Sequence, residues 1–130
     1  MYVGRTFFQG DQIPVKVLPS KQAAYVAHNG QEHLVQNYEV LTGHGFTWIG
    51  SGNGHVPDGA VSSGNLASGE PIYVGRAHYE GSLTVGKVHK SHGVMYLPFA
   101  GSEHSVTQYE VLCGQSRCKI ILIFIFLKVL

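Results

Sequence analysis

An internal repeat is the feature that most constrains how this chain can fold. When the sequence is offset by 71 positions, residues 1–43 align with residues 72–114 without a gap, and 18 of the 43 pairs are identical. Identity at this level indicates duplication of one structural unit. Because 130 residues correspond to one ordinary domain, we expect the two copies to share a single folded body.

A segment of a different kind lies between the two copies. Residues 44–71 are rich in glycine and occur once, so we call this segment unit A and each copy unit B. The predicted organisation is a half repeat over 1–43, a complete A–B repeat over 44–114, and a tail over 115–130. The tail holds an apolar run over 120–127, which is too short for a membrane-spanning helix of about 20 residues. We expect this run to be either a central core strand or a site of self-association, and its composition favours self-association.

Unit B has the pattern of short β-strands. Residues 71–79 are aromatic and β-branched, and residues 82–88 can pair with them after a Glu-Gly turn. Residues 94–97, closed by a proline, and residues 106–112, which alternate, are further strands, and residues 46–49 are a strand of unit A. No window of 12 residues shows a helical period free of Gly or Pro. The sequence therefore predicts an all-β, antiparallel, short-stranded domain.

Composition and motifs exclude several functional classes. Nine Lys and Arg against eight Asp and Glu leave no basic excess, so we expect no nucleic-acid partner. The sequence contains no nucleophile elbow, P-loop or dinucleotide fingerprint. We therefore expect that the protein is not an enzyme and that it binds no cofactor. His89 and His92 alone have a metal-like spacing, without a Cys pair or an H-E-x-x-H helix, and we expect no metal site. The first residues lack a secretory h-region, which favours a cytoplasmic or vesicle-associated protein, or one released without a signal peptide.

Six short blocks carry a further signal because of their order along the chain. They are Trp48, residues 54–61, residues 70–77, Gly86 with Lys87, residues 98–104 and residues 109–112. In this order they resemble the DM-nine repeat family, and the resemblance extends over both copies of unit B. It implies an all-β fold built from two intertwined repeats. It also implies mannose binding in pathogen recognition, as in invertebrate lectin-like proteins, and a likeness to the module that precedes pore-forming segments in the natterin group.

The resemblance also indicates candidate sugar contacts. The family's sugar-contacting lysine corresponds to Lys87 and, through the internal repeat, to Lys16. The family's aspartate would lie just after Gly64, where this chain has Asn65 and Leu66. Sugar binding requires donors and acceptors for hydroxyl groups beside an apolar face. The candidate acceptors are Asn65, Asp58, Glu103, His104, Glu32 and His33.

Each of these candidates has a structural alternative. The lysines could be exposed surface charges. In the repeated Gly-x-Glu-His block, glycine would adopt a turn and the other two residues would satisfy backbone groups, and we favour this interpretation. Trp48 is expected to anchor the core rather than stack on a sugar. Glu110 lies between apolar residues and is either an edge-strand gatekeeper or a buried partner of Arg76 or Lys87, and we favour the ion pair.

Taken together, the sequence favours a mannose-type carbohydrate-binding module in innate immunity, with homodimers providing multivalency. The alternative is a vesicle-associated or protein-interaction module that has lost sugar binding, since the aspartate is missing. If the first hypothesis holds, Lys87→Ala should weaken mannose binding by about 1.5–3 kcal/mol. The same change should leave the melting temperature nearly unchanged.

Overall fold

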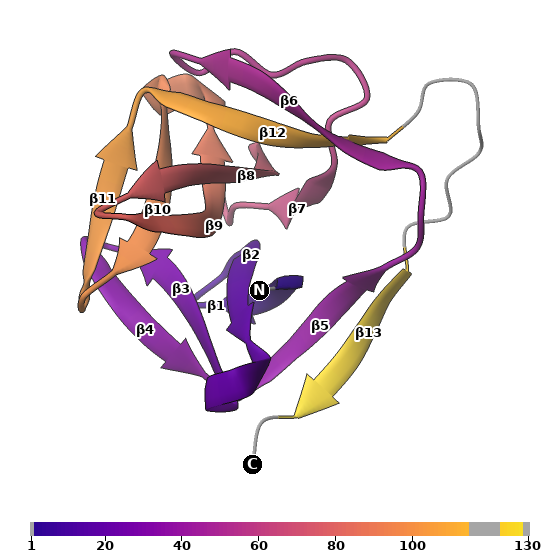
Figure 1. Ribbon diagram of the computed structural model, residues 1–130, viewed down its shortest axis with the longest axis vertical. Coiled ribbons are helices and arrows are strands. Elements are labelled where there is room, and N and C mark those ends of the chain that lie inside the picture. Colours follow the sequence, from indigo (N-terminus) through magenta and orange to yellow (C-terminus); the bar gives the residue numbers. More distant parts are fainter. Residues whose placement is uncertain (1, 115–122, 129–130) are drawn as a thin grey trace.

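The computed structural model of the chain is all-β and antiparallel, as the sequence predicts (Figure 1). It describes residues 2–114 and 123–128. The first copy of unit B forms β1 (Tyr2–Phe8), β2 (Asp11–Leu18), the 3-10 turn η1 (Pro19–Lys21), β3 (Ala23–His28), β4 (Gln31–Val35) and β5 (Asn37–Thr42). Unit A forms β6 (Phe46–Gly52) and β7 (Ser62–Asn65). The second copy forms β8 (Pro71–Tyr79), β9 (Ser82–His89), η2 (Lys90–His92), β10 (Val94–Phe99), β11 (Ser102–Val106) and β12 (Gln108–Gly114), and the tail contributes β13 (Ile123–Lys128).

Most predicted strands are present, and the differences have physical reasons. The strand expected to close at Pro98 continues to Phe99, because β10 at that point is paired on one side only and tolerates the missing N–H. The strand predicted over 106–112 is two strands, since β11 pairs with β10 and β12 pairs with β6 and β8. Strand β7 has the sequence Ser-Ser-Gly-Asn, which lacks the β-branched residues that indicate a strand.

The strands described form one curled sheet in which the two copies meet edge to edge. Its order is β13-β5-β1-β2-β3-β4-β11-β10-β9-β8-β12-β6, with β7 paired to β8. At the junction of β4 and β11, the Glu32 N–H donates to Gly101 O and the Glu103 N–H donates to Gly30 O, both at 3.0 Å. The same contact is thus made in both directions, which is the signature of an approximate two-fold relation between the copies.

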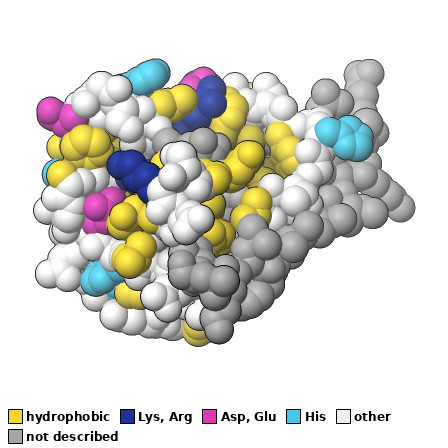
Figure 2. Space-filling model, turned by 60° about the horizontal axis from the view of Figure 1, so that its bottom comes forward, with side chains coloured by type: hydrophobic (Ala, Val, Ile, Leu, Met, Phe, Trp, Pro, Cys, Tyr) yellow, Lys and Arg dark blue, Asp and Glu magenta, His cyan; other side chains and the backbone are white. Residues whose placement is uncertain are grey.

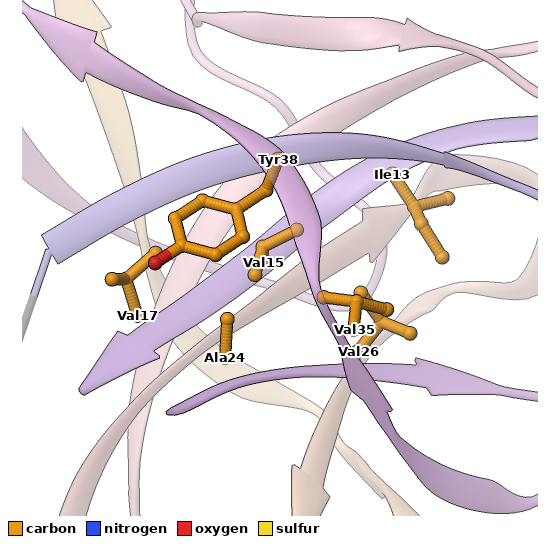
Figure 3. Packing of buried hydrophobic residues seen from close by; sticks show 7 residues of the cluster. All are labelled: Ile13, Val15, Val17, Ala24, Val26, Val35 and Tyr38. Atoms are coloured by element: carbon orange, nitrogen blue, oxygen red, sulfur yellow. The ribbon is translucent and has the colours of Figure 1, made fainter. Parts of the chain in front are cut away.

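Each copy of unit B builds its own hydrophobic cluster, and the two clusters use several equivalent positions. The first-copy cluster, shown in Figure 3, contains Ile13, Val15, Val17, Ala24, Val26, Val35 and Tyr38. The second-copy cluster contains Ala77, Val88, Met95, Leu97, Tyr109, Val111 and Cys113. Full burial of an aliphatic side chain contributes about 1.5–3 kcal/mol, so each copy has a core of its own.

Unit A contacts both copies of unit B and connects them. Strand β6 pairs with β12 along its whole length, and β7 pairs with β8. On the other side, Ser63 Oγ donates to Gln12 O of the first copy at 3.2 Å. Any Cβ at Gly64 would collide with the Gln12 side chain, so this close approach requires glycine. A third cluster joins residues of unit A and both copies: Val61, Val74, Val85 and Leu112, with Val3, Leu41, Phe46 and Trp48 packed against them.

The tail strand β13 lies on the first copy where β6 lies on the second. It pairs antiparallel with β5, with Ile123 opposite Thr42 and Lys128 opposite Asn37. At the two equivalent positions on β12, the opposing residues belong to β6. Strand β13 stands at the end of the strand order, which makes it an edge strand rather than the central strand considered as one alternative.

This position leads to a prediction for the tail. The members identified in all three hydrophobic clusters precede Gly114, so a chain ending at Gly114 is expected to keep its β-sheet circular dichroism and a cooperative melt. It should also be less oligomeric, because an apolar segment without proline is removed. Size-exclusion chromatography with light scattering measures the second effect. Loss of the cooperative melt would show instead that β13 is required for folding.

Candidate functional site

The first candidate residue, Lys16, is buried rather than exposed. It lies near the end of β2 with 7% of its surface accessible. Its Nζ donates to Pro98 O at 2.7 Å and lies 3.5 Å from Glu32 Oε2. Burial lowers the pKa of Lys16, and the Glu32 carboxylate partly offsets that effect by favouring the charged form. The alternative of an exposed surface charge is therefore wrong for this lysine.

The equivalent Lys87 on β9 is buried to the same extent. Its Nζ lies 3.1 Å from Glu103 Oε2, an oxygen that makes no hydrogen bond within the described part of the chain. A tyrosine ring lies beside each lysine, with Lys16 Nζ 5.8 Å from the Tyr25 ring centre and Lys87 Nζ 5.6 Å from that of Tyr96. The duplication has thus preserved a Lys–Glu–Tyr group at two places.

The glutamates of these groups connect the two copies of unit B. Glu103 Oε1 accepts a hydrogen bond from the Gly30 N–H, and Glu32 Oε1 accepts one from the Gly101 N–H, both at 3.0 Å. The two glycines have φ values of 80° and 84°, in the left-handed region that glycine adopts freely. The turn interpretation of the Gly-x-Glu-His block is confirmed for these residues.

The histidines of the same block also bind backbone within their own hairpins. His33 Nε2 donates to His28 O at 3.1 Å, and His104 Nε2 donates to Phe99 O at 3.0 Å. His104 Nδ1 further pairs with the Tyr79 hydroxyl at 2.9 Å. These two side chains therefore hold the turns in place, and neither lines the pocket around Lys16.

That pocket lies between the two copies and has a volume of about 240 Å³. Lys16 and Glu32 supply a hydrogen-bond donor and an acceptor, and the rings of Tyr25 and Phe99 supply apolar surface. A few convergent polar groups beside an aromatic face are the chemistry that sugar recognition needs. The sequence did not predict the pocket residues contributed by the second copy, because they lie far from Lys16 along the chain and no motif relates them to it. The lining residues are Lys16, Leu18, Lys21, Tyr25, Glu32, Ser82, Phe99 and Ala100.

The remaining predicted site residues lie elsewhere. Asp58 is exposed in the loop between β6 and β7, Asn65 is exposed at the end of β7, and neither lines this pocket. Leu66 packs against the first-copy cluster. The nearby backbone is held by a residue that the sequence did not indicate, since Ala67 N–H donates to Asp11 Oδ1 at 2.7 Å.

The different surroundings of Asn65 and Leu66 lead to different predictions for restoring the family's missing carboxylate at each of them. Asn65→Asp changes an exposed side chain, so we expect the free energy of unfolding to change by less than about 0.5 kcal/mol. We expect the same change to strengthen mannose binding, because a carboxylate accepts hydroxyl hydrogen bonds better than an amide does. Calorimetric titration with methyl α-mannoside measures this. Leu66→Asp should instead destabilise the first-copy cluster, and an Asn65→Asp protein with no gain would exclude this loop from the site.

The predicted ion pair of the repeated Tyr-Glu-Val-Leu block is confirmed. Arg76 Nε lies 2.8 Å from Glu110 Oε1, and in the first copy Arg5 Nε lies 3.3 Å from Glu39 Oε1. The Arg76 guanidinium also stacks over the Trp48 ring at 4.4 Å. Trp48 is partly buried and packs against the third cluster, in agreement with a core role.

The histidines beside Lys87 form a cluster with carboxylates. His89 and His92 stack at 3.6 Å, and His89 Nδ1 lies 3.3 Å from Glu70 Oε2. Burial lowers the pKa of His89, so its neutral form is favoured in the folded protein, and any stability it contributes is lost as the pH falls below its ordinary value. Among the described residues, no group of three or more His, Cys, Asp or Glu is arranged to hold a metal ion.

The fold and the pocket define a duplicated all-β domain with a ligand-sized site between its copies. The DM9 repeat family matches residues 1–106, which is most of the chain, and the protein belongs to that family. Natterin-3 of Thalassophryne nattereri is 40% identical over 65 residues, covering 50% of this chain and 15% of the relative. Natterin-4 of the same organism is 32% identical over 88 residues, covering 65% of this chain and 19% of the relative.

These matches bear on the class of protein. The chain spans less than a fifth of the length of each natterin, so the similarity concerns one module of those proteins. Membership of the DM9 repeat family, together with the natterin matches, suggests a lectin-like module. The helices described here are single 3-10 turns, and none has the length or apolar character needed to cross a membrane.

Proposed function

We propose that this chain is a carbohydrate-binding module that recognises mannose-type glycans in innate recognition, acting by binding and not by catalysis. The observation that carries the proposal is the pocket around Lys16. There a buried Lys–Glu pair faces aromatic surface from both copies, at the position of the family's sugar-contacting lysine.

The pocket suggests how a sugar would be held. Lys16 has three N–H donors, and two of them are directed at Pro98 O and Glu32, which leaves one for a sugar hydroxyl. Tyr25 and Phe99 offer apolar surface to the C–H face of the ring. A shallow site of this kind binds weakly by itself, so dimers would supply the avidity needed for recognition of a glycan surface.

A paired substitution tests this proposal without leaving a buried charge. Lys16→Met combined with Glu32→Gln removes the sugar-binding charges but keeps an oxygen for the Gly101 N–H. Binding of methyl α-mannoside, measured by calorimetry, should fall by about tenfold or more, as expected for hydrogen bonds to charged groups. The matched pair Lys87→Met with Glu103→Gln reports on the second copy. Unchanged binding in both variants would exclude the Lys16 pocket and the surroundings of Lys87 as the sugar site.

A second function is favoured by one observation. Leu66, one of the two residues that stand where the family's aspartate is expected, packs against the first-copy cluster and offers no carboxylate. We therefore keep the alternative of a vesicle-associated or protein-interaction module that has lost sugar binding. A glycan array separates the two, because a folded protein that binds no glycan on the array would support the alternative.

A further inference from the structure

The Lys16 pocket differs in charge from the equivalent positions of the repeat. It contains two lysines, Lys16 and Lys21, and one glutamate, Glu32, which gives one net positive charge. At the equivalent positions Lys87 and Glu103 recur, whereas His92 stands in place of Lys21 and Asp11 stands in place of Ser82. The excess of lysine over carboxylate is therefore particular to the Lys16 pocket.

Asp11, at the position equivalent to Ser82, is paired through both of its oxygens. Its Oδ1 accepts a hydrogen bond from the Ala67 N–H at 2.7 Å, and its Oδ2 lies 3.0 Å from His28 Nε2. His28 is the equivalent of Phe99, which lines the Lys16 pocket. A carboxylate and its imidazole partner thus stand where the Lys16 pocket has a serine and a phenyl ring.

Lys21 is the source of the unbalanced charge in the Lys16 pocket. It is exposed at the end of η1, and no carboxylate of the described residues lies within salt-bridge distance of its Nζ. The other charges are already matched, because Glu32 pairs with Lys16 through one oxygen and binds the Gly101 N–H through the other. The positive charge of Lys21 also acts on Lys16 and contributes to lowering its pKa.

The chain as a whole is sparsely charged. Charged residues make up 13% of its sequence, and on the face shown in Figure 2 few charged side chains stand among apolar and uncharged polar ones. A single unmatched charge at a pocket therefore has little competition from its surroundings, and it can decide which ligands approach.

We propose that the Lys16 pocket binds sugars that carry a negative charge, a carboxylate or a phosphate, more tightly than it binds neutral sugars. The inference rests on the proposed function, because it assigns a substrate class to the pocket of the same carbohydrate-binding module. In this pocket the sugar ring would lie on Phe99 and Tyr25, and the anionic group would lie between Lys16 and Lys21.

The test compares four probes by calorimetry: mannose, mannose 6-phosphate, glucuronate and inorganic phosphate. At about 20 mM salt, the two charged sugars should bind about 5–10-fold more tightly than mannose, because one additional charge pair is formed. At about 0.5 M salt the preference should nearly disappear, since an exposed charge is screened. Inorganic phosphate should bind more weakly than mannose 6-phosphate, because it has no ring for the aromatic surface.

The internal repeat supplies the variants for this test. Ser82→Asp and Lys21→His place in the Lys16 pocket the residues found at the equivalent repeat positions, and the latter is measured at about pH 8, where histidine is neutral. Each change should abolish the preference for charged sugars. Lys90→Gln is the control, since it removes an exposed lysine that does not line the Lys16 pocket. The preference should persist in this variant.

Several results would overturn the inference. Equal affinity of the natural protein for neutral and charged sugars would overturn it and leave the proposed function standing. A preference that survives both Ser82→Asp and Lys21→His would place the anion elsewhere. Phosphate binding as tight as that of mannose 6-phosphate would indicate an anion site without sugar recognition. Failure of all the sugars to bind would remove both the inference and the proposed function.

Discussion

Replacing Lys87 by alanine is expected to lower the free energy of unfolding by about 3–5 kcal/mol, the cost of leaving one member of a buried ion pair without its partner. The side chains of Lys87 and Glu103 are only 9% and 11% exposed, and Lys87 Nζ is the cation beside Glu103 Oε2. This burial corrects the expectation from the sequence that Lys87→Ala would leave the melting temperature nearly unchanged. Chemical denaturation followed by circular dichroism measures the loss.

A double variant distinguishes this mechanism from a simple loss of packing. Lys87→Met with Glu103→Gln is the matched control, because glutamine still accepts from the Gly30 N–H. A Lys87→Ala protein as stable as this double variant would contradict the buried-charge account.

The second large effect concerns Gly86 in the middle of β9. A Cβ added there would overlap the carbonyl oxygen of Tyr96 and lie 2.9 Å from Leu97 Cα, both of them backbone atoms of β10. Backbone cannot rotate away as a side chain does, so β9 and β10 must separate. We therefore expect Gly86→Ala to lower the free energy of unfolding by about 3 kcal/mol, the upper end of the usual cost of overpacking.

Gly50 provides the control for this prediction. It lies in β6, its φ is not in the left-handed region, and an added Cβ would meet nothing within 4 Å. Gly50→Ala should therefore change the free energy of unfolding by less than about 0.5 kcal/mol. Comparison of the two glycine variants by the same denaturation measurement isolates the steric effect. Equal stability of the two would show that β9 and β10 can move apart freely.

Several features of this protein were available from its sequence because they depend on local pattern. Turn residues and β-branched runs predicted β8 and β9 almost to the residue, and the offset of 71 predicted two equivalent units within one domain. A glutamate between apolar residues of an alternating strand favoured an ion pair for Glu110, and Arg76 was one of the two candidate partners. The ordered blocks were sufficient to identify the family.

Other features depended on how distant segments meet. Strand β13 has an apolar composition that predicts neither its partner β5 nor its edge position, because pairing depends on which edge is left open. Strand β7 is stabilised by its neighbours on β8 rather than by its own residues, and its composition gives no strand signal.

The sequence by itself determined the duplication, the all-β class, the family and most of the hairpins. Each of these depends on residues that are close together in the chain or on blocks that are repeated. Only the tertiary structure decided that Lys16 and Lys87 are buried, because their exposure depends on the opposite copy. It also decided that Val15 fits in the first copy where Gly86 is required in the second, although the two positions are equivalent in the repeat. The pocket between the copies has the same origin, since Phe99 reaches Lys16 only when two segments more than 80 residues apart pack together.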